Sequence, residues 1–237
     1  MRLNIRKPHE VNSLGVKERQ ERERETVARA ILDAARDLFV THGYQEVSIR
    51  KIAEKIEYSP AAIYGYFPSK DDIFFALAQE GFDLLFSYAE IPEMAADEDP
   101  ADRLHRQFWR YYEFSKHYPE YFALMFLDRT VPRISQNWER FGLVAEKKHD
   151  LIIGIQRAID AGAFPPGTSA SAVFHIVLAS IHGVATQRLC DRLPPGTDAD
   201  ILARATLATI IAGLKAGAAR DLSIPECPEP LNEDQQS

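Results

Sequence analysis

Residues 48–70 (SIRKIAEKIEYSPAAIYGYFPSK) restrict the fold of this chain more than any other segment. Between Ile49 and Ile56, apolar residues recur at the i, i+3, i+4, i+7 spacing of one helical face. Ser59 then stands at the N-cap position of a second helix, and Pro60 follows at its first position, where the missing N–H costs nothing. The segment therefore predicts two short helices joined by a tight turn.

The second of these helices spans only about two turns, from near Pro60 to Tyr66. Ser69 and Asp72 have the spacing of a capping box and begin the next helix. A short helix with an apolar back, followed by a tight turn and a slim helix that carries hydroxyl groups, is suited to the major groove of DNA. The pattern therefore predicts a DNA-binding helix pair.

A helical hairpin that only packs against the rest of the protein is the alternative interpretation. Such a hairpin would need large apolar side chains at positions 61, 62 and 65. This chain has alanine, alanine and glycine there, which are too small to build a core. The DNA-binding interpretation is therefore favoured.

Composition excludes several other classes of protein. The 237 residues are 46% hydrophobic and 27% charged, which is typical of a soluble globular protein. No apolar run is expected to span a bilayer and the N-terminus lacks a signal-peptide core, so we expect a cytoplasmic location. Cys190 and Cys227 lack zinc-ligand spacing, and no nucleophile, metal or phosphate-loop motif is present. We therefore predict a protein that is not an enzyme and has no cofactor or metal.

The net charge of −7 is unevenly distributed along the chain. Residues 1–70 contain 13 Lys and Arg against 10 Asp and Glu, whereas residues 71–237 contain 15 against 25. Positive charge is thus concentrated near the predicted helix pair, and an acidic body discourages nonspecific wrapping onto DNA. The asymmetry agrees with DNA binding by the N-terminal region.

Helical periodicity and Pro/Gly breaks predict an all-α chain with two domains. Before and after the helix pair, helices are expected over residues 22–42, which Gly43 ends, and over residues 70–90. Further helices are expected over residues 101–117, 119–129, 133–161, 169–191 and 198–220. The predicted regions are a flexible extension (1–21), an N-terminal three-helix helix-turn-helix DNA-binding domain (22–68), a C-terminal helical-bundle domain for ligand binding and dimerisation (69–222) and a disordered tail (223–237).

Residues 48–70 resemble the DNA-binding region of TetR-type (tetracycline-repressor-like) transcriptional regulators. The similarity is carried by Ser48, Ile52, Ala53, Ser59, Tyr64, Phe67, Ser69 and Lys70. Residues 31–44 (ILDAARDLFVTHGY) also look like the first helix of that family. The turn departs from the family, which usually has Ala-Gly-Val where this chain has Ile-Glu-Tyr at 56–58. If Glu57 is left-handed, it costs about 1 kcal/mol or somewhat more.

The resemblance implies DNA contacts from eight residues: Ser48, Arg50, Ser59, Ala61, Ala62, Tyr64, Tyr66 and Lys70. Ser48 and the first N–H groups of its helix would meet a phosphate, and Lys70 would add a point charge on the DNA backbone. The two alanines would keep the helix slim and offer methyl contact to thymine. Arg22 and Arg24 would reach DNA as well, or they would belong to a solvated helix start, because glutamates alternate with them.

Residues 108–141 are unusually rich in aromatic side chains, and in the resembling family this region forms an effector pocket. The residues predicted to line such a cavity are Phe108, Tyr112, Met125, Trp138 and Phe141. Ordinary core packing is the alternative for each of them. His175 and His182 lie on one helical face without a nearby third ligand, which favours core or interface histidines over a metal site.

The last two predicted helices carry many alanines and glycines, and in the resembling family two such helices from each subunit form a dimer interface. The expected function is a homodimeric transcriptional regulator, a repressor that a small hydrophobic or aromatic effector releases from a palindromic operator in double-stranded DNA. The alternative is a DNA-binding or adaptor protein without small-molecule induction, whose helical body binds a protein partner.

Overall fold

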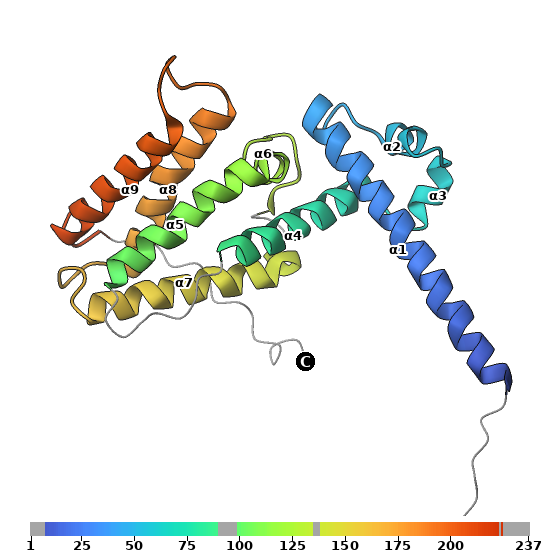
Figure 1. The fold of residues 1–237 in the computed structure, drawn as a ribbon, viewed down its shortest axis with the longest axis horizontal. Helices are drawn as coiled ribbons and strands as arrows, with labels where there is room; N and C mark the ends of the chain where they lie inside the picture. The colour runs from blue at the N-terminus through green and yellow to red at the C-terminus, as the bar shows by residue number, and fades with distance from the viewer. Residues whose placement is uncertain (1–7, 90–98, 135–137, 223, 225–237) are drawn as a thin grey trace, which may run out of the picture. The chain divides into compact units, whose positions relative to one another are not determined.

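The computed structural model describes the chain except for residues 1–7, 90–98, 135–137, 223 and 225–237 (Figure 1). The side chains of residues 8–16, 138 and 139 also lie outside the described part. All regular elements within the described ranges are helical, and the backbone pairs there only in an isolated bridge between Thr168 and Arg220. The all-α fold predicted from the sequence is therefore confirmed.

The chain divides into two compact units, each described here by itself. The first comprises residues 1–77 together with residues 130–132, and the second comprises residues 78–129 and 133–237. The first unit contains α1 (Pro8–His42), α2 (Ile49–Lys55), α3 (Pro60–Tyr64) and the start of α4 (Lys70–Ala89). The rest of α4 belongs to the second unit, as do α5 (Pro100–His117), α6 (Pro119–Phe126), η2 (Trp138–Phe141), α7 (Gly142–Asp160), α8 (Ala170–Leu189) and α9 (Ala199–Lys215).

Helix α1 begins well before Arg22, where the sequence had suggested its start. Its C-terminal part packs through Ile31, Ala34, Ala35 and Phe39, all of which are buried. In the N-terminal part, the described side chains of residues 17–26 are all exposed and bury no core. Oppositely charged side chains four residues apart support it as a helix, among them Arg19–Glu23 and Glu18–Arg22. The predicted helix start at residue 22 was wrong because these charge pairs, rather than apolar periodicity, extend the helix.

Two capped turns shape the first unit. Gly43 has a φ of +79° and donates its N–H to the Phe39 carbonyl at 2.8 Å, so it ends α1 as predicted. Glu57 has a φ of +61° and ends α2 in the same left-handed conformation. Its N–H bonds the Glu54 carbonyl at 3.3 Å, and the next N–H, from Tyr58, bonds the Ala53 carbonyl at 2.9 Å. This is the Schellman arrangement, which usually has glycine where this chain has glutamate.

The strain at Glu57 leads to a stability prediction. We expect Glu57→Gly to raise the free energy of unfolding by about 1 kcal/mol, because glycine has no Cβ to oppose the left-handed backbone. The matched control is Glu54→Gly within α2, which should lower it by about 1 kcal/mol. Urea denaturation measures both changes. A loss of stability in Glu57→Gly would contradict the assigned turn geometry.

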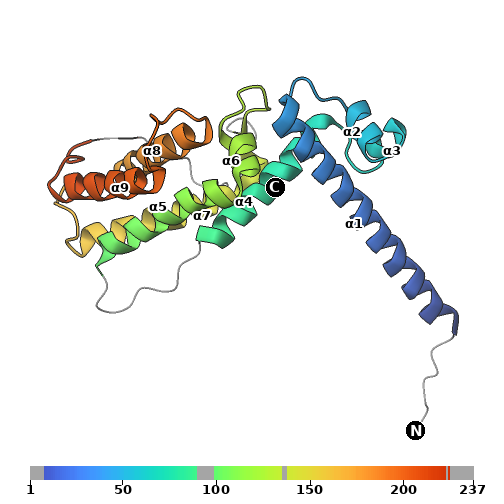
Figure 2. The same ribbon diagram turned by 45° about the horizontal axis from the view of Figure 1, so that its top comes forward.

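In the second unit, α8 contacts α5, α7 and α9, so these four helices form a bundle (Figures 1 and 2). Helix α8 is long and apolar enough to span a bilayer by length and composition, contrary to the sequence-based expectation that no run would be. Half of its most apolar window is buried against neighbouring helices, as in the central helix of a bundle. A single helix between residues 133 and 161 was also wrong, because η2 precedes α7 and the longer helix begins only at Gly142.

Helix α4 is held in the second unit by its C-terminal half. Glu80 accepts a hydrogen bond from the Tyr121 hydroxyl at 2.6 Å. Arg110 donates to the carbonyl of Tyr88 at 3.1 Å, close to the helix end. At Gly81 the packing is so close that an added Cβ would lie 2.4 Å from a neighbouring methionine sulfur. These contacts tie α4 to α5 and α6, and the same helix continues from the first unit.

Candidate nucleic-acid interface

Two serines cap α2 and α3 at their N-termini, Ser59 as predicted and Ser48 in addition to its predicted phosphate contact. The hydroxyl of Ser48 accepts the N–H of Lys51 at 3.3 Å. The hydroxyl of Ser59 accepts the N–H of Ala62 at 3.2 Å, with Pro60 in the first turn of α3 as expected. Because each side chain satisfies a helix N–H that has no partner within the helix, both short helices begin where the sequence predicted.

One face of α3 is anchored and the other is exposed. Ile63 is completely buried and fixes α3 to the first unit. On the outer side, Ala61 is exposed, Ala62 is half-buried and Tyr64 is 54% exposed. A five-residue helix with methyl groups and one hydroxyl on its free face is narrow enough to enter a major groove, which is about 12 Å wide.

Arg50 lies on the exposed side of α2. Its Nε donates to Glu54 Oε1 at 2.9 Å, and the arginine side chain is 80% exposed. Exposed pairs at this spacing contribute only about 0.3–0.5 kcal/mol. A phosphate or a guanine edge can therefore replace the glutamate at little cost, which agrees with the role implied by the family resemblance.

Arg24 fixes the far end of α3 to α1. Its guanidinium donates to the carbonyl of Gly65, the residue that caps α3, at 3.1 Å. The guanidinium carbon also lies 5.3 Å from the centroid of the Tyr66 ring, within the range of a cation–π contact. The sequence left open whether Arg22 and Arg24 contact DNA or solvent. In the structure, Arg24 positions the end of α3, and Arg22 pairs with Glu18 at 3.9 Å.

Lys70 points toward the protein rather than standing free. Its ammonium donates to the carbonyls of Tyr44 at 2.9 Å and Val47 at 3.0 Å, and it lies 4.0 Å from the Tyr44 ring centroid. Burial lowers the pKa of Lys70, an effect that the charge of Asp71 opposes. The Tyr44 hydroxyl in turn donates to the Asp71 carboxylate. Lys70 thereby holds the turn before α2, a role that no local pattern could reveal because its partners lie 23 and 26 residues away.

We expect Lys70→Met to lower the free energy of unfolding by about 1–3 kcal/mol, because two partly buried carbonyls lose a charged donor. The matched control is Lys51→Met. The Lys51 ammonium donates to the Glu46 carbonyl at an exposed site, so its loss should lower the free energy of unfolding by less than about 1 kcal/mol. Urea denaturation measures both. Equal effects of the two substitutions would contradict the role of Lys70 in holding the turn.

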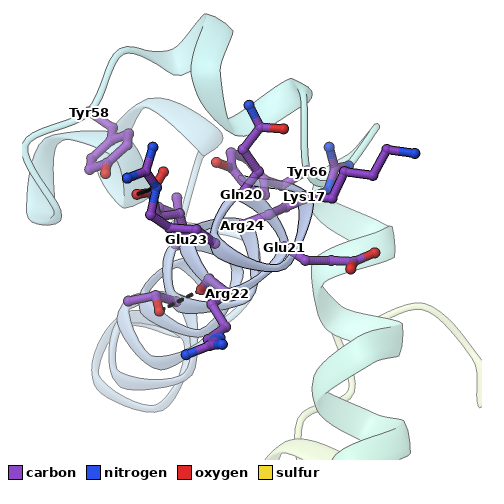
Figure 3. A pocket seen from close by; sticks show the side chains of 11 residues that line it. Lys17, Gln20, Glu21, Arg22, Glu23, Arg24, Tyr58 and Tyr66 are labelled. Carbon is purple, nitrogen blue, oxygen red and sulfur yellow. Dashed lines mark hydrogen bonds and ion pairs between the residues drawn. The ribbon is translucent and has the colours of Figure 1, made fainter. Parts of the chain in front are cut away.

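An open groove of about 1030 Å³ lies within the first unit, between residues 17–27 of α1 and the side chains of Tyr58 and Tyr66 (Figure 3). Lys17 and Gln20 lie beside Tyr66 in this view, whereas Arg22 lies on the other side of α1. We call this site the α1 groove. Sequence patterns had not suggested it, because it depends on the N-terminal extension of α1.

The residues predicted to line an effector cavity contact different helices of the second unit. The Phe108 ring centroid lies 6.1 Å from that of Phe174 in α8. The Tyr112 hydroxyl donates to Asp200 Oδ1 in α9 at 2.9 Å. Phe108 and Tyr112, which both belong to α5, are buried. They lie toward the last two helices of the bundle.

Met125 and Phe141 lie toward α4 instead. Met125 packs on Gly81, and the Phe141 ring centroid lies 5.6 Å from that of Phe82. Trp138 begins η2, but its side chain falls outside the described part of the structure. The shared cavity of these five residues therefore stays a prediction.

A histidine completes an aromatic cluster in the same unit. His182 stacks on Phe122 with centroids 5.3 Å apart, and its Nδ1 lies 2.8 Å from the Tyr111 hydroxyl. Burial lowers the pKa of His182 and raises that of Tyr111, so the environment favours the neutral form of both side chains. His175 has a different environment, with its Nδ1 2.7 Å from a carbonyl one turn earlier in α8.

Known proteins resemble this chain most clearly in the first unit. Residues 31–77 match the model of bacterial regulatory proteins of the tetR family. The HTH-type transcriptional repressor Rv1474c of Mycobacterium tuberculosis is 44% identical over 52 residues, which are 22% of this chain and 28% of the repressor. The chain thus matches only about a quarter of the length of the curated relatives found.

Solved structures extend the likeness to most of the chain. The TetR family transcriptional regulator PfmR of Thermus thermophilus aligns with a TM-score of 0.58 and 24% identity, over 78% of this chain and 98% of PfmR. FadR of Bacillus subtilis, solved in complex with stearoyl-CoA, aligns with a TM-score of 0.63 and 16% identity, over 78% of this chain and 98% of FadR. Residues 31–77 therefore carry a helix-turn-helix region that is similar to bacterial regulatory proteins of the tetR family, and the chain shares the helical fold of these solved structures.

Proposed function

We propose that this protein is a DNA-binding transcriptional regulator, acting as a repressor in the cytoplasm. The observation that carries the proposal is the slim, capped helix α3, whose free face presents Ala61 and Tyr64 while Ile63 anchors it. The curated relatives of this chain are named as transcriptional repressors, and the tetR-family model matches residues 31–77, which include α3. In the proposed complex, α3 enters the major groove, and Ser48 and Arg50 contact the flanking phosphates.

A homodimer would read a palindromic operator. One face of α9 supports this part of the proposal, because Ile201, Ala205, Ala208 and Ala212 lie on it at helical spacing and are all exposed. Ile201 is 64% exposed, which is unusual for a large apolar side chain. Small residues let two helices approach closely, and two-fold symmetry would place the reading helices about 34–36 Å apart or a multiple of that distance.

A small hydrophobic or aromatic effector would act through the second unit. Helix α4 begins in the first unit and is held by α5 and α6 in the second, so a ligand that favours one position of α4 would change DNA affinity. FadR of Bacillus subtilis, which shares this fold, was solved in complex with stearoyl-CoA. A coupling of about 1–3 kcal/mol would weaken operator binding roughly 5- to 150-fold.

Regulation without a small molecule is the second candidate. The described members of the predicted lining, Phe108, Tyr112, Met125 and Phe141, are all buried among protein side chains, which favours a body that is complete without a ligand. In that case the body would bind a protein partner. A ligand-dependent rise in melting temperature that is accompanied by weaker DNA binding would favour the effector model.

Selection from a pool of random duplexes of about 40 base pairs tests DNA binding, and footprinting then gives the site. We expect an enriched palindrome; failure to enrich any sequence would overturn the proposal.

Sedimentation velocity tests the dimer through Ala208→Arg, which should yield monomers. The matched control is Ala161→Arg at the exposed end of α7, which should not. Equal DNA affinity with and without every compound that raises the melting temperature would overturn the effector model.

A further inference from the structure

The N-terminal extension of α1 is a part of this chain that the family model does not include. That model matches from residue 31, whereas α1 begins at Pro8. Residues 17–26, whose side chains the structure describes, are all exposed and cover no core. Figures 1 and 2 both show α1 running on past α2 and α3 within the first unit. An ordered helix without a core to cover calls for another partner.

The extension is fixed beside the end of the proposed reading helix. Arg24 bonds the carbonyl of Gly65 at 3.1 Å and lies over the Tyr66 ring. Lys17 precedes Arg24 by seven residues, which is about 10 Å along a helix. Along one DNA strand this distance corresponds to about three phosphates. The contact with Gly65 therefore holds the cations of the extension at a fixed distance from α3.

The α1 groove has the charge and the hydrogen-bond donors that a phosphate backbone requires. Its charged lining includes Lys17, Arg19 and Arg24 against two acids, Glu21 and Glu23, so positive charge is in excess even without Arg22, in a chain of net charge −7. Tyr58 and Tyr66 add hydroxyl groups. Among the described side chains, Arg19 and Arg22 form long, exposed ion pairs of 4.0 Å and 3.9 Å, and such pairs are easily exchanged for phosphate.

We infer that the α1 groove holds the sugar-phosphate backbone of the duplex that flanks the base pairs read by α3, with Lys17 and Arg19 on the phosphates. This inference rests on the proposed DNA binding. The extension then lengthens the contacted DNA on the outer side of each half-site without reading its sequence, because phosphate contacts carry no base information. The protein thus gains affinity from a surface outside the family's matched region.

The test compares Lys17→Gln/Arg19→Gln with a control that changes net charge equally, Lys147→Gln/Arg192→Gln at exposed sites of the second unit. The probe is the duplex selected by the unmodified protein. Two lost phosphate contacts per protomer, four in the dimer, should reduce the slope of log affinity against log salt by about 3.6, and the affinity at 0.1 M salt by roughly 4000-fold. The charge-conserving variant Lys17→Arg/Arg19→Lys should keep the salt slope and the affinity of the unmodified protein. Melting temperatures check that all variants fold.

Trimming the duplex supplies a second readout. Removing about three base pairs from each end should weaken binding by the unmodified protein but not by Lys17→Gln/Arg19→Gln. An unchanged salt slope in that variant, or an equal loss in the control, would overturn the inference while leaving DNA binding intact. If the unmodified protein binds no duplex at all, the proposed function itself fails.

Discussion

Ala61→Glu should abolish specific DNA binding while leaving the protein folded. Ala61 lies on the free face of α3, so a carboxylate there would meet phosphates and base edges in the major groove. Like charges brought together in an interface cost several kcal/mol, and we expect operator affinity to fall by about 100-fold or more. Binding to the selected duplex, measured by fluorescence anisotropy, checks this.

Two controls separate charge from size at the same position. Ala61→Gln adds nearly the same volume without a charge and should lose less affinity than Ala61→Glu. Ala61→Ser keeps the helix slim and should bind almost as well as the unmodified protein. Because the position is exposed, all three proteins should melt within a few degrees of one another. Unchanged operator binding by Ala61→Glu would show that α3 is not the reading helix.

Phe122→Ala should lower the free energy of unfolding by about 3–5 kcal/mol. Phe122 is completely buried, with its ring centroid 5.1 Å from that of Phe126 and 5.3 Å from the His182 ring. Truncation removes a whole ring and leaves a cavity that a close-packed cluster cannot fill. Urea denaturation followed by tryptophan fluorescence measures the effect, because the chain's two tryptophans, at positions 109 and 138, belong to the second unit.

The matched control for this prediction is Phe86→Ala in α4. Phe86 is only half-buried and stacks on Phe82 at 6.1 Å, so its loss should cost less, about 1–2 kcal/mol. Equal losses in the two variants would show that the cluster around Phe122 is not the centre of this core. A small loss in Phe122→Ala alone would point to a loosely packed body.

Local signals predicted the first unit well because each of its short helices is specified by neighbouring residues. Ser59 caps a helix that begins one residue later, and Gly43 ends α1, as the sequence indicated; Ser48 caps α2 in the same way. The left-handed Glu57 was a conditional expectation that the structure bears out. Caps and turns act over three or four residues, so both partners of each contact lie close together in the sequence.

Expectations failed where charge or distant contacts override local periodicity. The Glu/Arg-rich start of α1 has no apolar stripe, yet i,i+4 pairs support it as a helix. The break between η2 and α7 also escaped prediction. The role of Arg24 in holding Gly65 was likewise hidden, because the two residues are 41 positions apart.

The sequence alone determined that this chain is all-helical and that residues 48–70 form a capped helix pair with a slender exposed member, since spacing, caps and side-chain size act locally. Only the tertiary structure decided what each side chain meets. In the folded protein, Lys70 donates to two carbonyls. Tyr112 contacts α9, Phe141 contacts α4, and Arg24 of α1 lies over the Tyr66 ring. Such contacts join residues far apart in the chain, and their choice depends on how whole helices pack rather than on any neighbouring residue.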